Sequence, residues 1–315
     1  MDSRLTDVGA AQHVALMNAL TGNLAPVWSV GPGEARRRAQ KSRTPDDDRV
    51  TSYDLRIPGA SELRDARVYL PNPHVAGVLL FFHGGGWVLG DLEMNDGLCR
   101  QLALRSGAAV VSLDYRLAPE HPFPAGLEDA AAALTWLASG AGPGEPGGPI
   151  AVGGHSAGGN FAAVLARRSR DGFLPPVVHQ LLLCPVLDSD VNRASYLEFG
   201  DGLLLTREDM IFFWDQYLPD GANRVSPDAS PLRVADARGL PPATVVVAGA
   251  DPLRDEALEY GSRLRNAGVP VREIVQPGVP HLFLTFPPSG GTVQALQAAG
   301  ESLRAVFTGI RKVHA

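Results

Sequence analysis

Hydrophobic and polar positions along the chain follow two different patterns. Segments 50–57 and 63–70 alternate crudely between apolar and polar residues, and Pro58-Gly59 lies between them. Such alternation on both sides of a turn predicts a β-hairpin. From residue 75 onward, apolar residues instead gather in short continuous runs, which are typical of strands buried on both faces. These runs cover residues 75–82, 108–113, 150–153, 177–183 and 244–248, and a further strand-like segment covers 272–275.

Helix-like stretches lie between and after these runs, over residues 127–137, 159–168, 256–266 and 293–311. Strands that alternate with helices predict a mostly parallel central sheet flanked by helices, which is the α/β class. The chain contains no internal repeat and no linker long enough to separate independent domains.

Two segments do not fit this alternation. Residues 1–48 contain two weak helical patterns, over 7–20 and 34–41, and residues 190–225 contain the aromatic-rich run Met210 to Trp214, followed by Tyr217. In an α/β domain ligands bind at the carboxyl ends of the strands, and we expect both segments there. The aromatic run fits an ordinary core helix as well as a lid over a pocket.

Composition and charge exclude several classes of protein. A net charge of −6 argues against a nucleic-acid or anionic-membrane partner, and we interpret the basic run Arg36 to Arg38 as the solvated face of a helix. The only two cysteines, Cys99 and Cys184, lie far apart, so buried reduced thiols are expected rather than a disulfide. The first residues lack a signal-peptide core and no apolar run is long enough to span a membrane, so we expect a cytoplasmic protein without stable membrane insertion.

The 35 glycines are numerous, and some of them form motifs. Residues 154–158 read GHSAG, which matches G-x-S-x-G, after a strand-like and before a helix-like segment. In this context Ser156 is typical of a nucleophile elbow, where small neighbours allow a strained turn.

A second glycine motif follows the strand-like run that ends at Phe82. Residues 83–87 read HGGGW, and three consecutive glycines leave backbone N–H groups uncovered. Such a loop can stabilise the negative oxygen that forms when an acyl carbonyl is attacked. We expect His83 to brace this loop. A phosphate loop is less consistent with the sequence, because GxGxxG spacing and a P-loop lysine are missing.

A serine nucleophile needs a histidine as base and an acid that orients the histidine. In α/β folds with such an elbow, the chain order is serine, acid, histidine. Downstream histidines are His179, within an apolar run, His314, next to the last residue, and His281, in a loop before the final helix. We therefore favour His281. For the acid, Asp251 follows the run 245–250, although a helix N-cap explains it nearly as well, and the nearest rival is Asp255, one turn further at the start of the helix-like stretch. His155, beside the nucleophile, is not expected to be the base. No HExxH or clustered Cys/His pattern is present, so no metal or cofactor is predicted.

Together these motifs resemble those of the bacterial hormone-sensitive-lipase-like carboxylesterases of the α/β-hydrolase fold. The resemblance rests on HGGGW at 83–87, DYRLAPEHPFPA at 114–125, the elbow at 154–160 and DPLRDE at 251–256, which occur in family order. It implies residues 1–48 and 190–225 as the two parts of a helical cap, and residues 49–189 and 226–315 as the catalytic domain.

Carried over by position, the resemblance implies Ser156 as nucleophile, His281 as general base and then acid, and Asp251 as the orienting carboxylate. It implies an oxyanion hole made by the N–H groups of Gly84, Gly85 and Ala157. This sequence departs from the family pattern at His155, where the family usually has Asp, and at Leu282, where it usually has Gly. Neither departure removes a reacting group.

The implied function is hydrolysis of small-molecule esters with short to medium acyl chains through an acyl-enzyme, without cofactor. The resemblance also implies a homodimer, because family members often pair through a sheet edge. An amidase, peptidase or lactonase with the same triad is the alternative, since fold and triad do not fix the leaving group. A non-catalytic receptor on this fold is disfavoured by His281, which the similar plant gibberellin receptors lack.

Overall fold

The computed structural model describes residues 2–21, 24–40, 44–45, 47–72, 77–285 and 289–313. Its central element is an eight-stranded sheet with strand order β1-β2-β4-β3-β5-β6-β7-β8. The strands are β1 (Val50–Pro58), β2 (Leu63–Pro71), β3 (Val78–Phe82), β4 (Ala109–Leu113), β5 (Ile150–His155), β6 (His179–Leu183), β7 (Ala243–Ala250) and β8 (Val271–Pro280). The β1–β2 and β2–β4 pairs are antiparallel and the other five pairs are parallel, so the prediction of a mostly parallel sheet that begins with a hairpin is confirmed.

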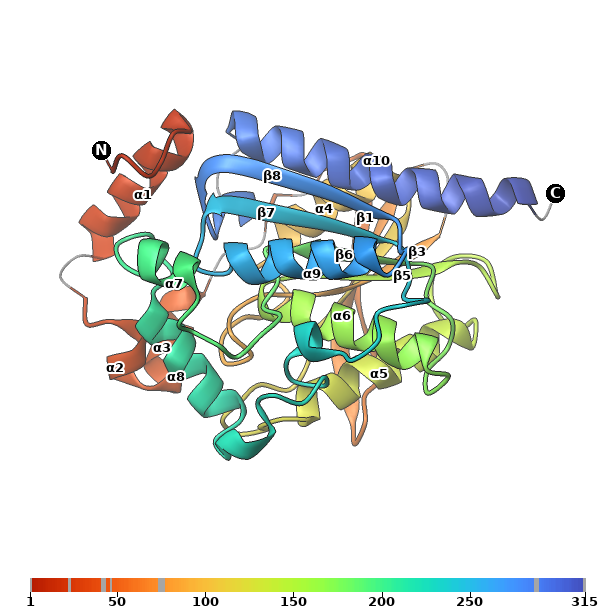
Figure 1. The fold of residues 1–315 in the computed structure, drawn as a ribbon. Helices are drawn as coiled ribbons and strands as arrows, with labels where there is room; N and C mark the ends of the chain where they lie inside the picture. Colours follow the sequence, from red (N-terminus) through yellow and green to blue (C-terminus); the bar gives the residue numbers. More distant parts are fainter. Residues whose placement is uncertain are drawn as a thin grey trace.

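Helices cover both faces of this sheet (Figure 1). One face carries α5 (Ala125–Ala138), α6 (Ala157–Arg170) and α9 (Arg254–Asn266), and the other carries α4 (Asp96–Ser106) and α10 (Gly290–Val313). The strand β3 explains the two layers: Leu80 and Phe82 belong to the core beneath the first group, whereas Leu79 and Phe81 belong to the core beneath the second. A strand buried on both faces must be apolar at every position, as the continuous runs predict.

The sequence pattern does not predict α4, and the structure gives the reason. Its apolar stripe, formed by Leu98, Leu102 and Ala103, is interrupted by Asp96 and Arg100, which are charged yet almost completely buried. Asp96 accepts hydrogen bonds from Arg100 of the same helix and from Arg67 of β2, each at 3.0 Å. Buried charges are tolerated when they are paired, and a pattern of apolar positions cannot detect that pairing.

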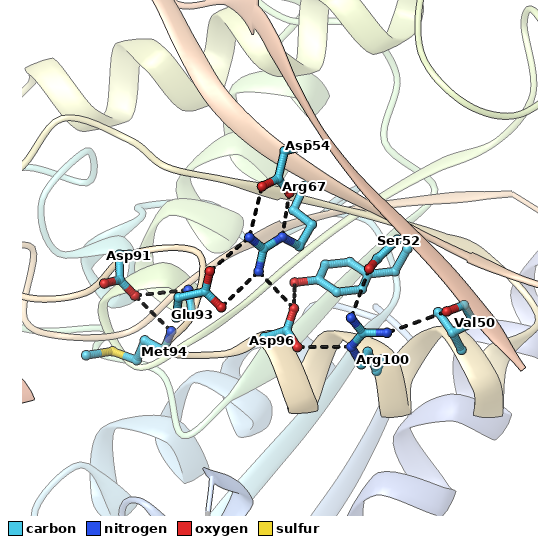
Figure 2. Close-up of polar contacts among 10 residues, drawn as sticks. Val50, Ser52, Asp54, Arg67, Asp91, Glu93, Met94, Asp96 and Arg100 are labelled. Atoms are coloured by element: carbon cyan, nitrogen blue, oxygen red, sulfur yellow. Dashed lines mark hydrogen bonds and ion pairs between the residues drawn. The ribbon is translucent and has the colours of Figure 1, made fainter. Parts of the chain in front are cut away.

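The same ion-pair cluster attaches the hairpin to α4 (Figure 2). Arg67 is 3% exposed and forms ion pairs with Asp54 of β1, with Glu93 of the loop before α4 and with Asp96 of α4. The hydroxyl of Tyr69 donates a further hydrogen bond to Asp96 at 2.7 Å. The outer antiparallel strands are therefore held to the parallel part of the domain by charged groups as well as by apolar packing.

The remaining helices gather at the end of the sheet where β7 continues into α9 (Figure 1). They are α1 (Val8–Thr21), α2 (Val27–Val30), α3 (Pro32–Ala39), α7 (Ala194–Phe199) and α8 (Arg207–Tyr217). The predicted helical patterns at 7–20 and 34–41 correspond to α1 and α3. Residue 41 of the second pattern lies outside the described part of the chain, and so do residues 75 and 76 of the strand predicted at 75–82. Within the described chain, no helix has the length and apolar character required to span a bilayer.

The interpretation of Arg36 to Arg38 as a solvated helix face is wrong for Arg36. Its guanidinium donates to the carbonyl oxygens of Val88 and Ala118, both at 2.7 Å, and forms an ion pair with Glu120. Arg37 and Arg38 do pair with Glu34 on the helix surface. Helical periodicity places Arg36 on the inner face, but only the tertiary structure supplies the carbonyls that it binds.

Candidate active site

Three side chains meet at the carboxyl ends of three parallel strands. Ser156 follows β5, Asp251 follows β7 and His281 follows β8. His281 Nε2 lies 2.9 Å from Ser156 Oγ, and His281 Nδ1 lies 2.8 Å from Asp251 Oδ2. Parallel strands end at the same edge of a sheet, which is why residues so far apart in sequence come into contact.

The hydrogen bonds define the proton positions in this chain of three groups. A carboxylate only accepts, so Nδ1 of His281 carries the ring proton and Nε2 can accept the proton of the Ser156 hydroxyl. The other carboxylate oxygen, Oδ1 of Asp251, accepts the N–H of Leu253 at 2.9 Å. Both oxygens of Asp251 are therefore bonded, and this fixes the orientation of the carboxylate towards His281.

Ser156 lies in a strained turn between β5 and α6. Its φ of 56° and ψ of −118° are sparsely populated by residues other than glycine. The surroundings impose this conformation: the Ser156 N–H donates to Leu183 O at 2.9 Å, and its carbonyl accepts from Val186 at 3.1 Å. A Cβ at Gly154 would overlap the backbone of Gly158, so the small residues around Ser156 are required by close backbone approach.

The glycine loop after β3 is held by side chains on both sides. His83 Nδ1 donates to Gly84 O at 2.7 Å, and burial lowers the pKa of the His83 imidazole to about 4, so the ring is neutral. The ring stacks on Tyr115 with a centroid distance of 4.2 Å, and the Tyr115 hydroxyl donates to His83 O at 2.9 Å. These contacts agree with the expectation that His83 braces the loop.

One of the three N–H groups expected to form the oxyanion hole already donates to a side chain outside the glycine loop. The Gly84 N–H donates to Oδ1 of the buried Asn95 at 3.1 Å. By contrast, the N–H groups of Gly85 and Gly86 have no acceptor among the described residues. Ala157 is the first residue of α6, so its N–H lacks an intrahelical acceptor and lies at the positive end of the helix dipole.

Sequence reasoning missed Asn95. It lies 11 positions after Gly84, just before a helix that the apolar pattern does not predict. Nothing in the local sequence indicates that an asparagine there would return to the glycine loop.

Helix α8 lies directly over the glycine loop. A Cβ on Gly86 would overlap the ring of Phe213, so helix and loop are in close contact there. Phe213 and Trp214 are buried, and Trp214 and Tyr217 both contact the ring of Trp87. The aromatic run 210–214 thus packs as a core helix does, and the surface against which it packs is the loop beside Ser156.

The alternative site residues lie elsewhere. His179 bonds Thr244 Oγ1 at 2.9 Å within the core, and Asp255 accepts the N–H of Ser195 at 2.8 Å. His314 is outside the described residues. His155 lies nearer to the candidate triad than expected, because its ring stacks on that of His281 at a centroid distance of 5.3 Å.

Comparison with known proteins gives consistent matches over most of the chain. A family model described as the alpha/beta hydrolase fold matches residues 79–285. A carboxylic ester hydrolase of Mycobacterium tuberculosis is 43% identical over 81% of this chain and 70% of its own length. An ethyl acetate hydrolase of Pseudomonas putida is 34% identical over 88% of this chain and 91% of its own length.

Solved structures match equally well. A thermostable esterase from Pseudomonas putida superimposes with a TM-score of 0.87 and 36% identity, covering 95% of this chain and 98% of its own. An α/β-hydrolase enzyme from the metagenome of Lake Arreo gives a TM-score of 0.89 and 32% identity, covering 98% of this chain and 100% of its own.

Proposed function

The chain belongs to the α/β-hydrolase family, and from this premise we propose that it is a serine carboxylesterase of the hormone-sensitive-lipase-like group, acting on short- to medium-chain acyl esters. The observation that carries the proposal is the hydrogen-bonded series Ser156–His281–Asp251. The names of the relatives support ester hydrolysis, and the residues of this chain supply a nucleophile, a base and an orienting acid in contact.

The reaction has two acyl-transfer steps. Ser156 Oγ attacks the ester carbonyl while His281 Nε2 takes its proton, and His281 then gives that proton to the departing alcohol. A water molecule, deprotonated by the same nitrogen, then attacks the acyl-enzyme; the bond from the acyl carbon to Ser156 Oγ breaks, and His281 Nε2 returns the proton to Oγ as the acid leaves. Throughout, Asp251 keeps the proton of Nδ1 in place and stabilises the positive charge that forms on the imidazole.

We propose an oxyanion hole formed by the N–H groups of Gly85, Gly86 and Ala157. Gly84, expected from the resemblance, is left out because its N–H is bonded to Asn95. Each preorganised donor of this kind is worth about 3 kcal/mol of transition-state stabilisation. Position 84 still requires a glycine, because a Cβ there would lie too close to the nucleophile turn, at 3.3 Å from Ser156 Cβ and 2.9 Å from His155 Nδ1.

We further propose that residues 1–48 and 190–225 form a cap over the catalytic domain of 49–189 and 226–315. The contacts of Arg36 with Val88 and of Phe213 with Gly86 support this, because both join cap helices to the loop that carries the proposed oxyanion hole. The N–H of Thr6 also donates to Gly278 O, close to His281, at 3.1 Å.

The homodimer and the cytoplasmic location are likewise proposals. Support for the homodimer is the position of β8 at the edge of the sheet, with Val275 44% exposed. Support for a reducing compartment is the pair of buried free thiols, Cys99 and Cys184. Cell fractionation tests the location.

The decisive test of the proposed nucleophile is Ser156→Ala with p-nitrophenyl butyrate. We expect turnover to fall to the background rate and labelling by a fluorophosphonate probe to disappear, while a panel of amide and lactone substrates measures leaving-group preference. Wild-type turnover in the variant would show that Ser156 is not the nucleophile.

A further inference from the structure

Cys184 lies beside the candidate triad but takes no part in the proposed reaction. It follows β6, has a φ of 44°, and its N–H donates to Val246 O at 2.9 Å, so its backbone is fixed. One donor atom each of Cys184, Asp251 and His281 lie within 4.8 Å of one another. Across the described part of the chain, no other three His, Cys, Asp or Glu side chains bring donor atoms this close.

We propose that Cys184, Asp251 and His281 form an inhibitory site for a thiophilic divalent cation of the Zn²⁺ class. Sulfur, imidazole nitrogen and carboxylate oxygen are all ligands that such a cation accepts in a tetrahedral arrangement. With metal–ligand bonds of about 2.0–2.3 Å, the donors must lie roughly 3.3–3.6 Å apart, closer than the 4.8 Å within which all three now lie. The distance between Nδ1 and Oδ2, now 2.8 Å, would therefore widen by about half an ångström, with the cation replacing the proton between them.

The charges favour a divalent cation at this position. A free thiol is uncharged below its ordinary pKa of about 8.5, so a cluster of thiol, imidazole and carboxylate, with the single proton between Nδ1 and Oδ2, carries one negative charge. With the cation bound, the thiolate and the carboxylate balance its two positive charges, and the buried cluster becomes neutral. Buried charges are costly unless they are compensated, which favours the neutral state.

Proton bookkeeping explains why this cation would inhibit the enzyme, an effect that rests on the proposed function. The thiol releases its proton to solvent, and the proton of His281 moves from Nδ1 to Nε2 when the metal bonds to Nδ1. Nε2 then donates to Ser156 Oγ instead of accepting from it. The base is blocked and the nucleophile cannot be activated.

Cadmium tests the site directly, because a cadmium–thiolate bond gives an ultraviolet charge-transfer band that does not depend on activity. We expect the full-length protein to bind one Cd²⁺ with this band and to lose p-nitrophenyl butyrate hydrolysis in parallel. In Cys184→Ala the band should disappear and the inhibition constant for Cd²⁺ should rise by at least an order of magnitude.

Cys99→Ala is the matched control, since Cys99 is the other buried free thiol and should leave both the band and the inhibition unchanged. Cys184→Ser, which preserves the side-chain size, repeats the test if the alanine variant does not fold. A band that persists without Cys184, or inhibition that is insensitive to its removal, would overturn the proposal. If the wild type hydrolyses no ester, the band still reports on the cation site, so the two proposals fail separately.

Discussion

At the scale of single residues, Asp251 and Asp255 are four positions apart yet have different partners. Asp251 is bonded to His281 Nδ1, whereas Asp255 accepts the N–H of Ser195 and pairs with Arg254. Sequence alone leaves both open as the acid, because each lies at the start of a helix-like stretch where a carboxylate is also a good N-cap. The direction of the two side chains distinguishes them.

We therefore expect Asp251→Asn to lower kcat by about 10⁴-fold, because an amide can no longer hold the imidazole in the tautomer that accepts the serine proton. Steady-state kinetics with p-nitrophenyl butyrate measure this. Asp255→Asn is the matched control and should keep kcat near the wild-type value. Equal losses of kcat in both variants would mean that Asp251 supports the fold and does not orient His281.

Asp114 offers a residue-scale prediction for stability. It lines an open, acidic pocket, and its carboxyl lies 4.0 Å from His83 Nε2. Burial, and then the neighbouring charges of Asp91 and Asp65, raise its pKa to about 6, against the opposing influence of Arg64. The folded state thus holds this proton more tightly than the unfolded state, and the ionised carboxylate destabilises the fold increasingly as pH rises from about 4 through 6.

Asp114→Asn removes this penalty. We expect the free energy of unfolding to rise by about 1–2 kcal/mol at pH 8, a value reduced for the partial exposure of the carboxyl, and to change little at pH 4. Urea unfolding of variant and wild type at both pH values measures the difference. Asp65→Asn, at a carboxyl that is 61% exposed, should change stability by less than about 0.5 kcal/mol. A gain in the free energy of unfolding at pH 4 equal to that at pH 8 would contradict the raised pKa of Asp114.

At the scale of elements, Arg36 joins α3 to two loops of the neighbouring domain. Arg36 donates hydrogen bonds to the carbonyl oxygen of Val88, just after the glycine loop, and to that of Ala118, in the segment after β4. The neighbouring Arg37 pairs, among the described contacts, only with Glu34 of its own helix. Hydrogen bonds from a charged donor are stronger than exposed ion pairs within a helix. The same basic run thus contains one anchoring residue and one surface residue.

Arg36→Ala should lower the free energy of local opening of α3 by about 2 kcal/mol, whereas Arg37→Ala should lower it by less than about 0.5 kcal/mol. Hydrogen–deuterium exchange of peptides covering residues 32–39 measures this local opening. Exchange that is equally fast in both variants would show that α3 is held by other contacts.

At the scale of the whole molecule, the sheet has two edges, β1 and β8. An edge strand presents unpaired backbone groups and can pair with another chain. Light scattering should give twice the 33.3 kDa chain mass if β8 pairs with a second copy. Val275→Arg on β8 should then produce monomers, because it places a charge at the contact.

Tyr53→Arg on β1, which is 43% exposed at the opposite edge, is the control and should leave the dimer intact. A monomer in the wild type, or dissociation by the β1 variant alone, would refute dimerisation through β8.

Apolar periodicity and the glycine motifs determine much of this protein without tertiary information. The continuous runs specify strands buried on both faces, because only such strands avoid polar positions on either side, and the hairpin, the parallel sheet and four of its flanking helices follow. The elbow at Ser156 can also be read locally, since close backbone approach demands glycine at nearby positions. Local patterns fail where charged residues are buried, as in α4 with Asp96 and Arg100, because their partners come from a distant strand.

Tertiary structure decides which groups meet. It brings His281 and Asp251 to Ser156, directs the Gly84 N–H to Asn95 rather than to the site, and places Cys184 beside the triad. Hydrogen bonds and cation coordination depend on distances of a few ångströms between atoms, and sequence spacing does not determine such distances across separate strands.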